Sequence, residues 1–181
     1  MRIIAGTLKG RPLLAPPGGA TRPTADRVRQ ALFDMLMHAP WAGHGFLAGA
    51  TVLDAFAGTG ALGLEALSRG AAHVTFFEQD RAALAALRAN IAACRAEDRC
   101  IVLSIDALRI PGGEKADIVF LDPPYGQDLV ARALARLRAT GRVGAGSLIV
   151  AETGRDEPPL EVETLAERKY GAAQVTVWLE G

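Results

Sequence analysis

The sequence predicts an α/β fold, in which a mostly parallel seven-stranded sheet ends in an antiparallel C-terminal hairpin. Apolar strand-like segments alternate with amphipathic helix-like segments from residue 51 onward, which is typical of βαβ units. The last two strand-like segments have no helix between them, which indicates a hairpin. The chain has 181 residues, of which 50% are hydrophobic and 22% charged, and this suits one domain with a small extension.

The N-terminal extension is predicted to be a basic hairpin followed by a helix. Short apolar runs flank a basic turn within residues 2–14, and a Pro-Pro-Gly-Gly run ends this segment. A helix is expected over 25–37, with Thr24 as its N-cap and with Leu32 and Leu36 on its apolar face. A loop is expected at 43–49.

The remaining elements follow from changes in hydrophobic periodicity. Strands are expected at 51–54, 73–78, 100–104, 118–122 and 148–152, followed by hairpin strands at 162–169 and 174–179. Helices are expected at 61–69, 80–94 and 127–139. Gly70 and Gly141 end two of these helices.

Composition narrows the class of protein. No apolar run is long enough to span a bilayer and the first residues do not resemble a signal peptide, so we expect a cytoplasmic protein without a membrane partner. Two cysteines and three histidines without ligand spacing predict no metal site. The net charge is zero, yet the first 40 residues hold six basic and two acidic residues. This excess predicts that the N-terminal end contacts phosphates.

The strand at 118–121 runs into Asp122, Pro123, Pro124 and Tyr125. Proline cannot donate to a sheet ladder, so the strand must end there and present these four residues at the carboxyl edge of the sheet. A carboxylate and a fixed carbonyl can accept the N–H groups of a nucleobase amine, while a tyrosine ring offers a stacking surface. These four residues are therefore the predicted catalytic set.

A glycine-rich turn, Gly58-x-Gly60-x-x-Gly63, follows the first strand of the sheet, and Glu78 ends the second. Glycines at these positions allow close approach of a ligand, and an acid at the second strand end can bind ribose hydroxyls. The glycines alone do not separate NAD from S-adenosylmethionine. Asp54 favours S-adenosylmethionine, because a carboxylate can pair with its cationic amino-acid end but would repel a pyrophosphate.

Three motifs occur in order along the chain. They are Arg22-Pro-Thr-x-x-Arg27-Val-Arg29-x-x-Leu-Phe, Leu53-Asp-Ala-Phe-Ala-Gly-Thr-Gly-Ala-Leu-Gly-Leu-Glu-Ala-Leu-Ser-Arg-Gly70, and Asp-Pro-Pro-Tyr125. Together they resemble the bacterial 16S ribosomal RNA guanine-N2 methyltransferase D family, within the class I S-adenosylmethionine-dependent methyltransferases of Rossmann-like fold. The departures are a chain that starts almost at the hairpin and a short segment at 109–115 before the fourth strand.

The resemblance implies methylation of the 2-amino group of one guanine in 16S ribosomal RNA, with S-adenosylmethionine as cofactor. Residues 1–40 would contact RNA and residues 41–181 would form the methyltransferase domain. The implied partner is ribosomal RNA in a small-subunit particle with ribosomal proteins, and the protein is expected to be a monomer without metal. The candidate cofactor-binding residues are Asp54, Phe56, Ala57, Gly58, Thr59, Gly60, Glu78, Gln79, Asp106, Ala107 and Asp122. The candidate RNA-binding residues are Lys9, Arg11, Arg22, Thr24, Arg27 and Arg29.

Other functions remain open at this point. A DNA amino-methyltransferase acting on adenine N6 or a protein glutamine methyltransferase would use similar chemistry, but these enzymes more often carry Asn where this chain has Asp122. A non-catalytic RNA-binding protein could keep the fold, although the acids that follow four successive strands, Asp54, Glu78, Asp106 and Asp122, argue against it. An NAD-dependent oxidoreductase is the third alternative.

Overall fold

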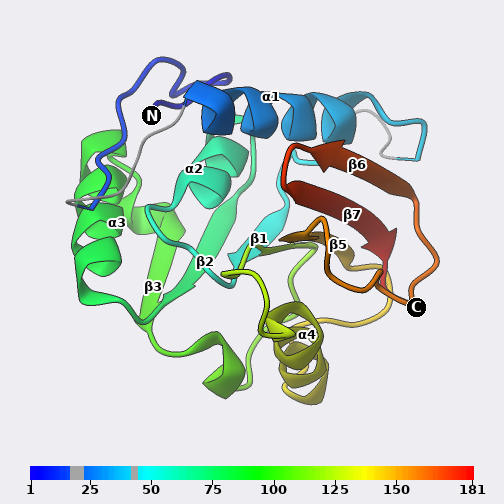
Figure 1. Cartoon of the computed structure of the whole chain (residues 1–181). Coiled ribbons are helices and arrows are strands. Elements are labelled where there is room, and N and C mark those ends of the chain that lie inside the picture. The colour runs from blue at the N-terminus through cyan, green and yellow to red at the C-terminus, as the bar shows by residue number, and fades with distance from the viewer. Residues whose placement is uncertain (17–22, 42–44) are drawn as a thin grey trace.

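The computed structural model describes residues 1–16, 23–41 and 45–181 of the chain. In this part of the chain seven strands form one sheet in the order β3-β2-β1-β4-β5-β7-β6 (Figure 1). Their bounds are Thr51–Asp54 (β1), His73–Glu78 (β2), Cys100–Ser104 (β3), Ile118–Leu121 (β4), Leu148–Gly154 (β5), Ala166–Tyr170 (β6) and Ala173–Leu179 (β7). The first five strands are parallel, and β7 is antiparallel to both β5 and β6. The predicted mostly parallel sheet with an antiparallel C-terminal hairpin is confirmed.

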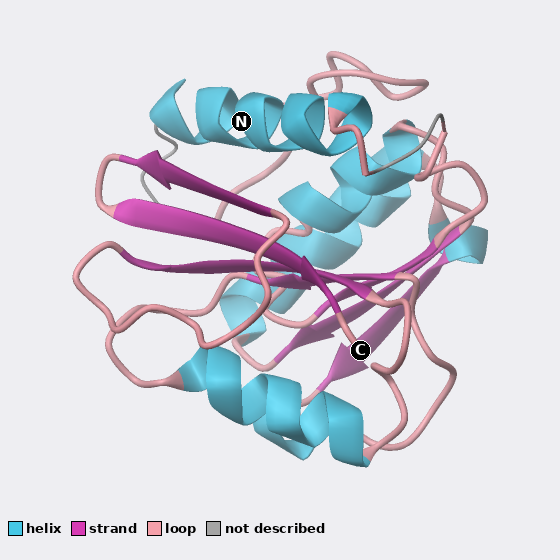
Figure 2. Cartoon of the chain, turned by 90° about the vertical axis from the view of Figure 1, so that its right-hand side faces the viewer, coloured by secondary structure: helices cyan, strands magenta, loops and turns pink. Residues whose placement is uncertain are grey.

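Helices cover both faces of the sheet. Their bounds are Pro23–His38 (α1), Ala61–Ser68 (α2), Arg81–Cys94 (α3) and Leu129–Ala139 (α4), with short 3-10 turns at Glu97–Arg99 (η1) and Ala107–Arg109 (η2). The apolar residues of α1, α2 and α3 pack in one core on one face, whereas those of α4 pack in a second core on the other. Figure 2 shows α1 and α4 on opposite sides of the sheet.

The N-terminal segment shares the first of these cores. Ile3, Leu8 and Leu13 are buried together with the apolar face of α1 and the inner face of α2. The segment folds back on itself as the predicted hairpin, but the hairpin is short: it has one antiparallel bridge, between Arg2 and Pro12, rather than two strands. Its backbone is held by hydrogen bonds of its own, including those from the N–H of Ile3 to Arg11 and from the N–H of Leu13 to Met1, and by side chains of α2.

Three predicted element starts differ from the structure. Helix α1 begins at Pro23, so Thr24 lies in its first turn and the predicted N-cap is wrong; proline suits the first helical position because its φ is preset. Helix α4 begins at Leu129 rather than near 127, because Asp128 has a left-handed φ of 52°.

Strand β6 begins at Ala166, later than the predicted start at residue 162. Val162 packs against the core on the α4 face, whereas Leu165 packs against the opposite core. Regular pairing with β7 starts only at Ala166, opposite Val177, and the backbone N–H of Val162 instead bonds to the carbonyl of Leu160 in a turn, so the strand does not begin at residue 162. Among the described residues, no helix is both long and apolar enough to cross a membrane.

Candidate active site

Acidic side chains meet at the carboxyl edge of the sheet. Strand β1 ends in Asp54, and β4 is followed by Asp122. Two cavities of about 470 and 480 Å³ open at this edge, and both are lined by Phe56, Gly58 and Asp122. We call them the first and the second cavity; Asp122 lies where the two adjoin.

The glycine-rich turn between β1 and α2 is shaped by its backbone. Gly58 and Gly60 have left-handed φ values of 53° and 79°. A Cβ on Gly63 would lie 2.4 Å from the ring of Phe76, so helix α2 can pack on β2 only with glycine there. A Cβ on Gly58 would meet nothing within 4 Å, which leaves its surroundings open to a ligand.

Asp54 is 1% exposed and lines the second cavity. Its Oδ2 accepts a hydrogen bond from the backbone N–H of Gly63 at 3.1 Å, and its Oδ1 has no hydrogen-bond partner in the described part of the chain. Burial raises the pKa of Asp54 to about 7; the Gly63 hydrogen bond opposes this rise, and the charge of Glu78 adds to it. A buried carboxylate oxygen without a partner is a site for a cationic group.

Glu78 anchors the opposite side of the turn. Its Oε2 accepts from the backbone N–H of Gly58 at 2.7 Å, and its Oε1 accepts from those of Gln79 and Asp80 at 2.8 Å. Glu78 and Gln79 line the first cavity together with Ala107. A carboxylate has lone pairs for further donors, so Glu78 can still accept from a ligand hydroxyl.

Asp106 is a predicted cofactor-binding residue that the structure does not place on the cavity wall. Its Oδ1 accepts from the backbone N–H of Leu108 at 2.9 Å and so caps the η2 turn. Its neighbours Ile105 and Ala107 line the first cavity, whereas Asp106 is not among the described lining residues.

The loop Asp122 to Tyr125 is held by two glutamates that the sequence reasoning did not select. The Tyr125 hydroxyl donates to Oε1 of Glu152 on β5. Oε1 of Glu157 accepts from the backbone N–H groups of Gly126 at 2.9 Å and Gly154 at 3.1 Å. The criterion of an acid near a strand end, applied to β5, would have found Glu152.

These contacts set the charge state of the loop. Loss of hydration among the surrounding residues raises the pKa of Asp122, and the negative charges of Glu152 and Asp54 raise it further. The side chain of Asp122 still reaches solvent through the cavities. Burial and the hydrogen bond to the Glu152 carboxylate raise the pKa of Tyr125. The Tyr125 ring is 43% exposed, so one surface of it is available for stacking.

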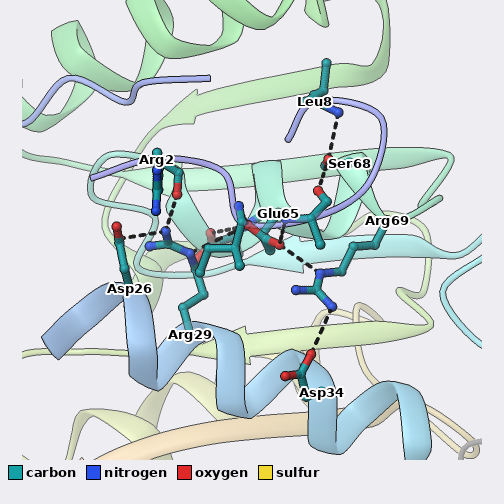
Figure 3. Close-up of polar contacts among 12 residues, drawn as sticks. Arg2, Leu8, Asp26, Arg29, Asp34, Glu65, Ser68 and Arg69 are labelled. Carbon is teal, nitrogen blue, oxygen red and sulfur yellow. Dashed lines mark hydrogen bonds and ion pairs between the residues drawn. The ribbon is translucent and has the colours of Figure 1, made fainter. Parts of the chain in front are cut away.

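The structure argues against a phosphate contact by Arg29. Its side chain is 5% exposed, donates to Oδ1 of Asp26 at 3.0 Å and to the carbonyl of Arg2, and lies 3.8 Å from Glu65 (Figure 3). Glu65 of α2 is fully buried, pairs with Arg69 at 2.8 Å and accepts from the backbone N–H of Ile4 at 2.8 Å. Arg29 therefore joins α1 to α2 and the N-terminal segment.

Replacement of Arg29 by methionine is expected to destabilise the protein by about 3 kcal/mol, because it leaves buried carboxylate charge less compensated. For a chain of this length the midpoint of thermal unfolding should fall by roughly 6 to 12 °C. Thermal denaturation followed by circular dichroism measures this. Arg27→Met is the matched control, since Arg27 is exposed on the same helix. Equal melting temperatures for the two variants would contradict the structural role of Arg29.

The other predicted RNA contacts fall into three groups. Lys9 and Arg27 border one surface depression of about 410 Å³ together with Arg2. Arg11 is exposed, and its guanidinium donates to the carbonyl of Ala93 on α3. Arg22 and the side chain of Thr24 lie outside the described residues.

Comparison with known proteins gives consistent matches. The family model described as Conserved hypothetical protein 95 matches residues 1–179. A Haemophilus influenzae protein named Ribosomal RNA small subunit methyltransferase D is 37% identical over 93% of this chain and 88% of its own. The Escherichia coli K12 protein of the same name is 40% identical over 84% of this chain and 74% of its own. A solved Escherichia coli structure, described only as a presumed methyltransferase, has a TM-score of 0.85 at 34% identity and covers 99% of this chain and 97% of its own.

Proposed function

The chain belongs to the ribosomal RNA small subunit methyltransferase D family and has its Rossmann-like methyltransferase fold, and from this premise we propose a specific reaction. The protein transfers a methyl group from S-adenosylmethionine to N2 of one guanine in 16S ribosomal RNA. The observation that carries the proposal is the position of Asp122, where a cavity suited to a nucleoside adjoins a cavity that holds an unpaired buried carboxylate.

The residues fit S-adenosylmethionine. The free Oδ1 of Asp54 suits the α-ammonium of its amino-acid end, and the open space at Gly58 allows close approach of the chain. Glu78 is available to ribose hydroxyls in the first cavity, where Phe77, Ile105 and Ala107 give an apolar surface for adenine. When bound, S-adenosylmethionine supplies an electrophilic methyl group on a sulfonium, which is a good leaving group.

The chain's own residues hold and orient the guanine amine. The Asp122 carboxylate and the Pro123 carbonyl accept the two N2–H groups, and the Tyr125 ring stacks on the base. Both hydrogen bonds lie in the plane of the base, so the nitrogen lone pair is left to form the new N–C bond as the C–S bond breaks. The proton on the cationic product passes to Asp122 or to water. Pro124 fixes the backbone of this loop, because its ring presets φ.

The basic residues beside α1 provide a surface for phosphates. Lys9 and Arg27 border the same depression, next to the first turn of α1, while Arg11 lies on the side of α3. We expect the double change Lys9→Ala and Arg27→Ala to weaken RNA binding by about tenfold and to reduce the salt dependence of log Kd by roughly 1 to 2. Binding to 16S ribosomal RNA across a potassium chloride titration measures both quantities.

The double change Lys115→Ala and Arg132→Ala is the matched control, because it also removes one lysine and one arginine, from exposed positions before β4 and on α4, the helix on the sheet face opposite α1. An unchanged salt slope for the Lys9 and Arg27 variant, or an equal loss in the control, would show that RNA does not follow this surface.

The proposed reaction is tested with small-subunit particles from cells that lack this protein. Labelled S-adenosylmethionine is added with the purified protein, and the modified nucleoside is identified by mass spectrometry. The expected product is N2-methylguanosine in 16S ribosomal RNA. Labelled DNA would favour an amino-methyltransferase of DNA, labelled protein a glutamine methyltransferase, and absence of both label and cofactor binding a non-catalytic RNA-binding protein.

A further inference from the structure

Glu152 of β5 stands beside Asp122 at the edge of the sheet. In the parallel pairing of β4 and β5, Leu121 is opposite Ala151, so the next residues on the two strands are neighbours. Adjacent strands lie about 4.8 Å apart. The charge of Glu152 contributes to the raised pKa of Asp122, as expected for two carboxylates at this spacing. Both side chains line the second cavity.

One oxygen of Glu152 is occupied and the other is free. Oε1 accepts the hydroxyl of Tyr125, which fixes the carboxylate relative to the stacking ring. Oε2 accepts no hydrogen bond from the residues that the structure describes. The free oxygen therefore belongs to a side chain that is already oriented, and a ligand donor can use it at little entropic cost.

The rest of the second cavity has apolar walls, and at Asp122 it adjoins the first cavity, which Tyr125 lines. Val28 and Leu32 of α1 line the second cavity on one side, and Val150 and Val175 line it from the sheet. Val175 is opposite Glu152 in the antiparallel pairing of β5 and β7, so an apolar residue flanks the acid. Between apolar walls, hydrogen bonds to a carboxylate are stronger than in water, and an unmatched acceptor is penalised more.

We propose that Glu152 reads the N1–H of the target guanine and is a specificity-determining residue of this site; the inference rests on the proposed function. Guanine presents N1–H directly beside its N2 amine, so two adjacent acceptors, Glu152 and Asp122, match two adjacent donors. Adenine and cytosine instead carry a ring-nitrogen lone pair beside their amines. That lone pair would face the Glu152 carboxylate, so the site rejects both bases by repulsion and by loss of a hydrogen bond.

The test exchanges one donor on the base and one acceptor on the protein. Small-subunit particles are reconstituted from 16S ribosomal RNA that carries either guanine or 2-aminopurine at the mapped target position. 2-Aminopurine keeps the N2 amine but has a lone pair at N1. Rates of N2 methylation are compared for the wild-type protein, Glu152→Gln and Glu157→Gln.

The wild-type protein should prefer guanine over 2-aminopurine in kcat/KM by at least about tenfold. In Glu152→Gln the amide oxygen can still accept the Tyr125 hydroxyl, while the amide N–H faces the base, where it opposes guanine N1–H and can donate to N1 of 2-aminopurine. The guanine preference should fall by about 100-fold relative to wild type. 2-Aminopurine also lacks O6, so the wild-type preference for guanine does not by itself report on Glu152. The test of Glu152 is the difference in this preference between the wild-type protein and Glu152→Gln.

Glu157→Gln is the matched control. Glu157 holds the same loop through Gly126 and Gly154 but is not among the described residues that line the second cavity. Whatever its effect on rate, this variant should keep the wild-type preference. If Glu152→Gln lowers both rates in the same proportion, the assignment of Glu152 is overturned while the proposed function stands. If the wild-type protein forms a nucleoside other than N2-methylguanosine, both are overturned.

Discussion

Replacing Asp122 by alanine is expected to lower kcat by about 10³-fold, because the guanine amine loses the acceptor that fixes its lone pair toward the methyl group. The affinity for S-adenosylmethionine should change by no more than a few-fold, since Asp54 and Glu78 remain. The two quantities are measured by single-turnover methylation and by calorimetric titration of S-adenosylmethionine.

Asp122→Asn separates positioning from charge. Asparagine keeps one acceptor oxygen at this position, so this variant should retain clearly more activity than Asp122→Ala if the main role is to hold the amine. Near-normal methylation by Asp122→Ala would rule out the positioning role. A large loss of cofactor affinity in that variant would instead place Asp122 mainly in the cofactor site.

Replacing Asp54 by asparagine is expected to have opposite effects on binding and on stability. The affinity for S-adenosylmethionine should fall by about 100-fold, because its ammonium loses a buried ionic partner. The cofactor-free protein should become more stable at pH 8, because the carboxylate of Asp54 is 1% exposed and one of its oxygens is unpaired. Asparagine can still accept the hydrogen bond from Gly63.

The effect on stability depends on pH in a defined direction. The pKa of Asp54 is raised from 3.8 to about 7 in the folded protein. Between these values the folded state binds more protons at Asp54 than the unfolded state does, so the contribution of Asp54 to the stability of the wild-type protein falls as the pH rises from about 4 to about 7. A shift of about three pKa units corresponds to at most ~4 kcal/mol at alkaline pH.

Thermal unfolding of the cofactor-free proteins at pH 5 and pH 8 measures this difference. Asp54→Asn should unfold at a higher temperature than the wild-type protein at pH 8, and the gap should narrow at pH 5. Addition of S-adenosylmethionine should raise the wild-type midpoint far more than that of the variant. A variant that is less stable than the wild type at pH 8 would show that Asp54 already has a compensating partner in the free protein.

Local chemistry made much of the fold predictable. The prolines after Leu121 end β4 as expected, and the glycines of the turn after β1 have the left-handed backbone that favours this residue. The alternation of strand-like and helix-like segments predicted βαβ units, because a parallel sheet needs helices to cover its two faces. The start of β6 was not predictable, since it depends on where the chain comes into register with β7, which it does at Ala166 opposite Val177.

In the candidate site, too, some features followed from the sequence and others only from the tertiary structure. The sequence by itself determined that Asp54, Glu78 and Asp122 lie at one edge of the sheet, because strand ends in a parallel sheet share an edge. Only the tertiary structure decided that Glu152 stands beside Asp122, through the register of β4 and β5. It also decided that Arg27 is exposed whereas Arg29, with the same charge on the same helix, is buried against Glu65 of α2. The physical reason is that periodicity gives the position of a residue on its own element, whereas burial and charge pairing depend on elements distant in the sequence.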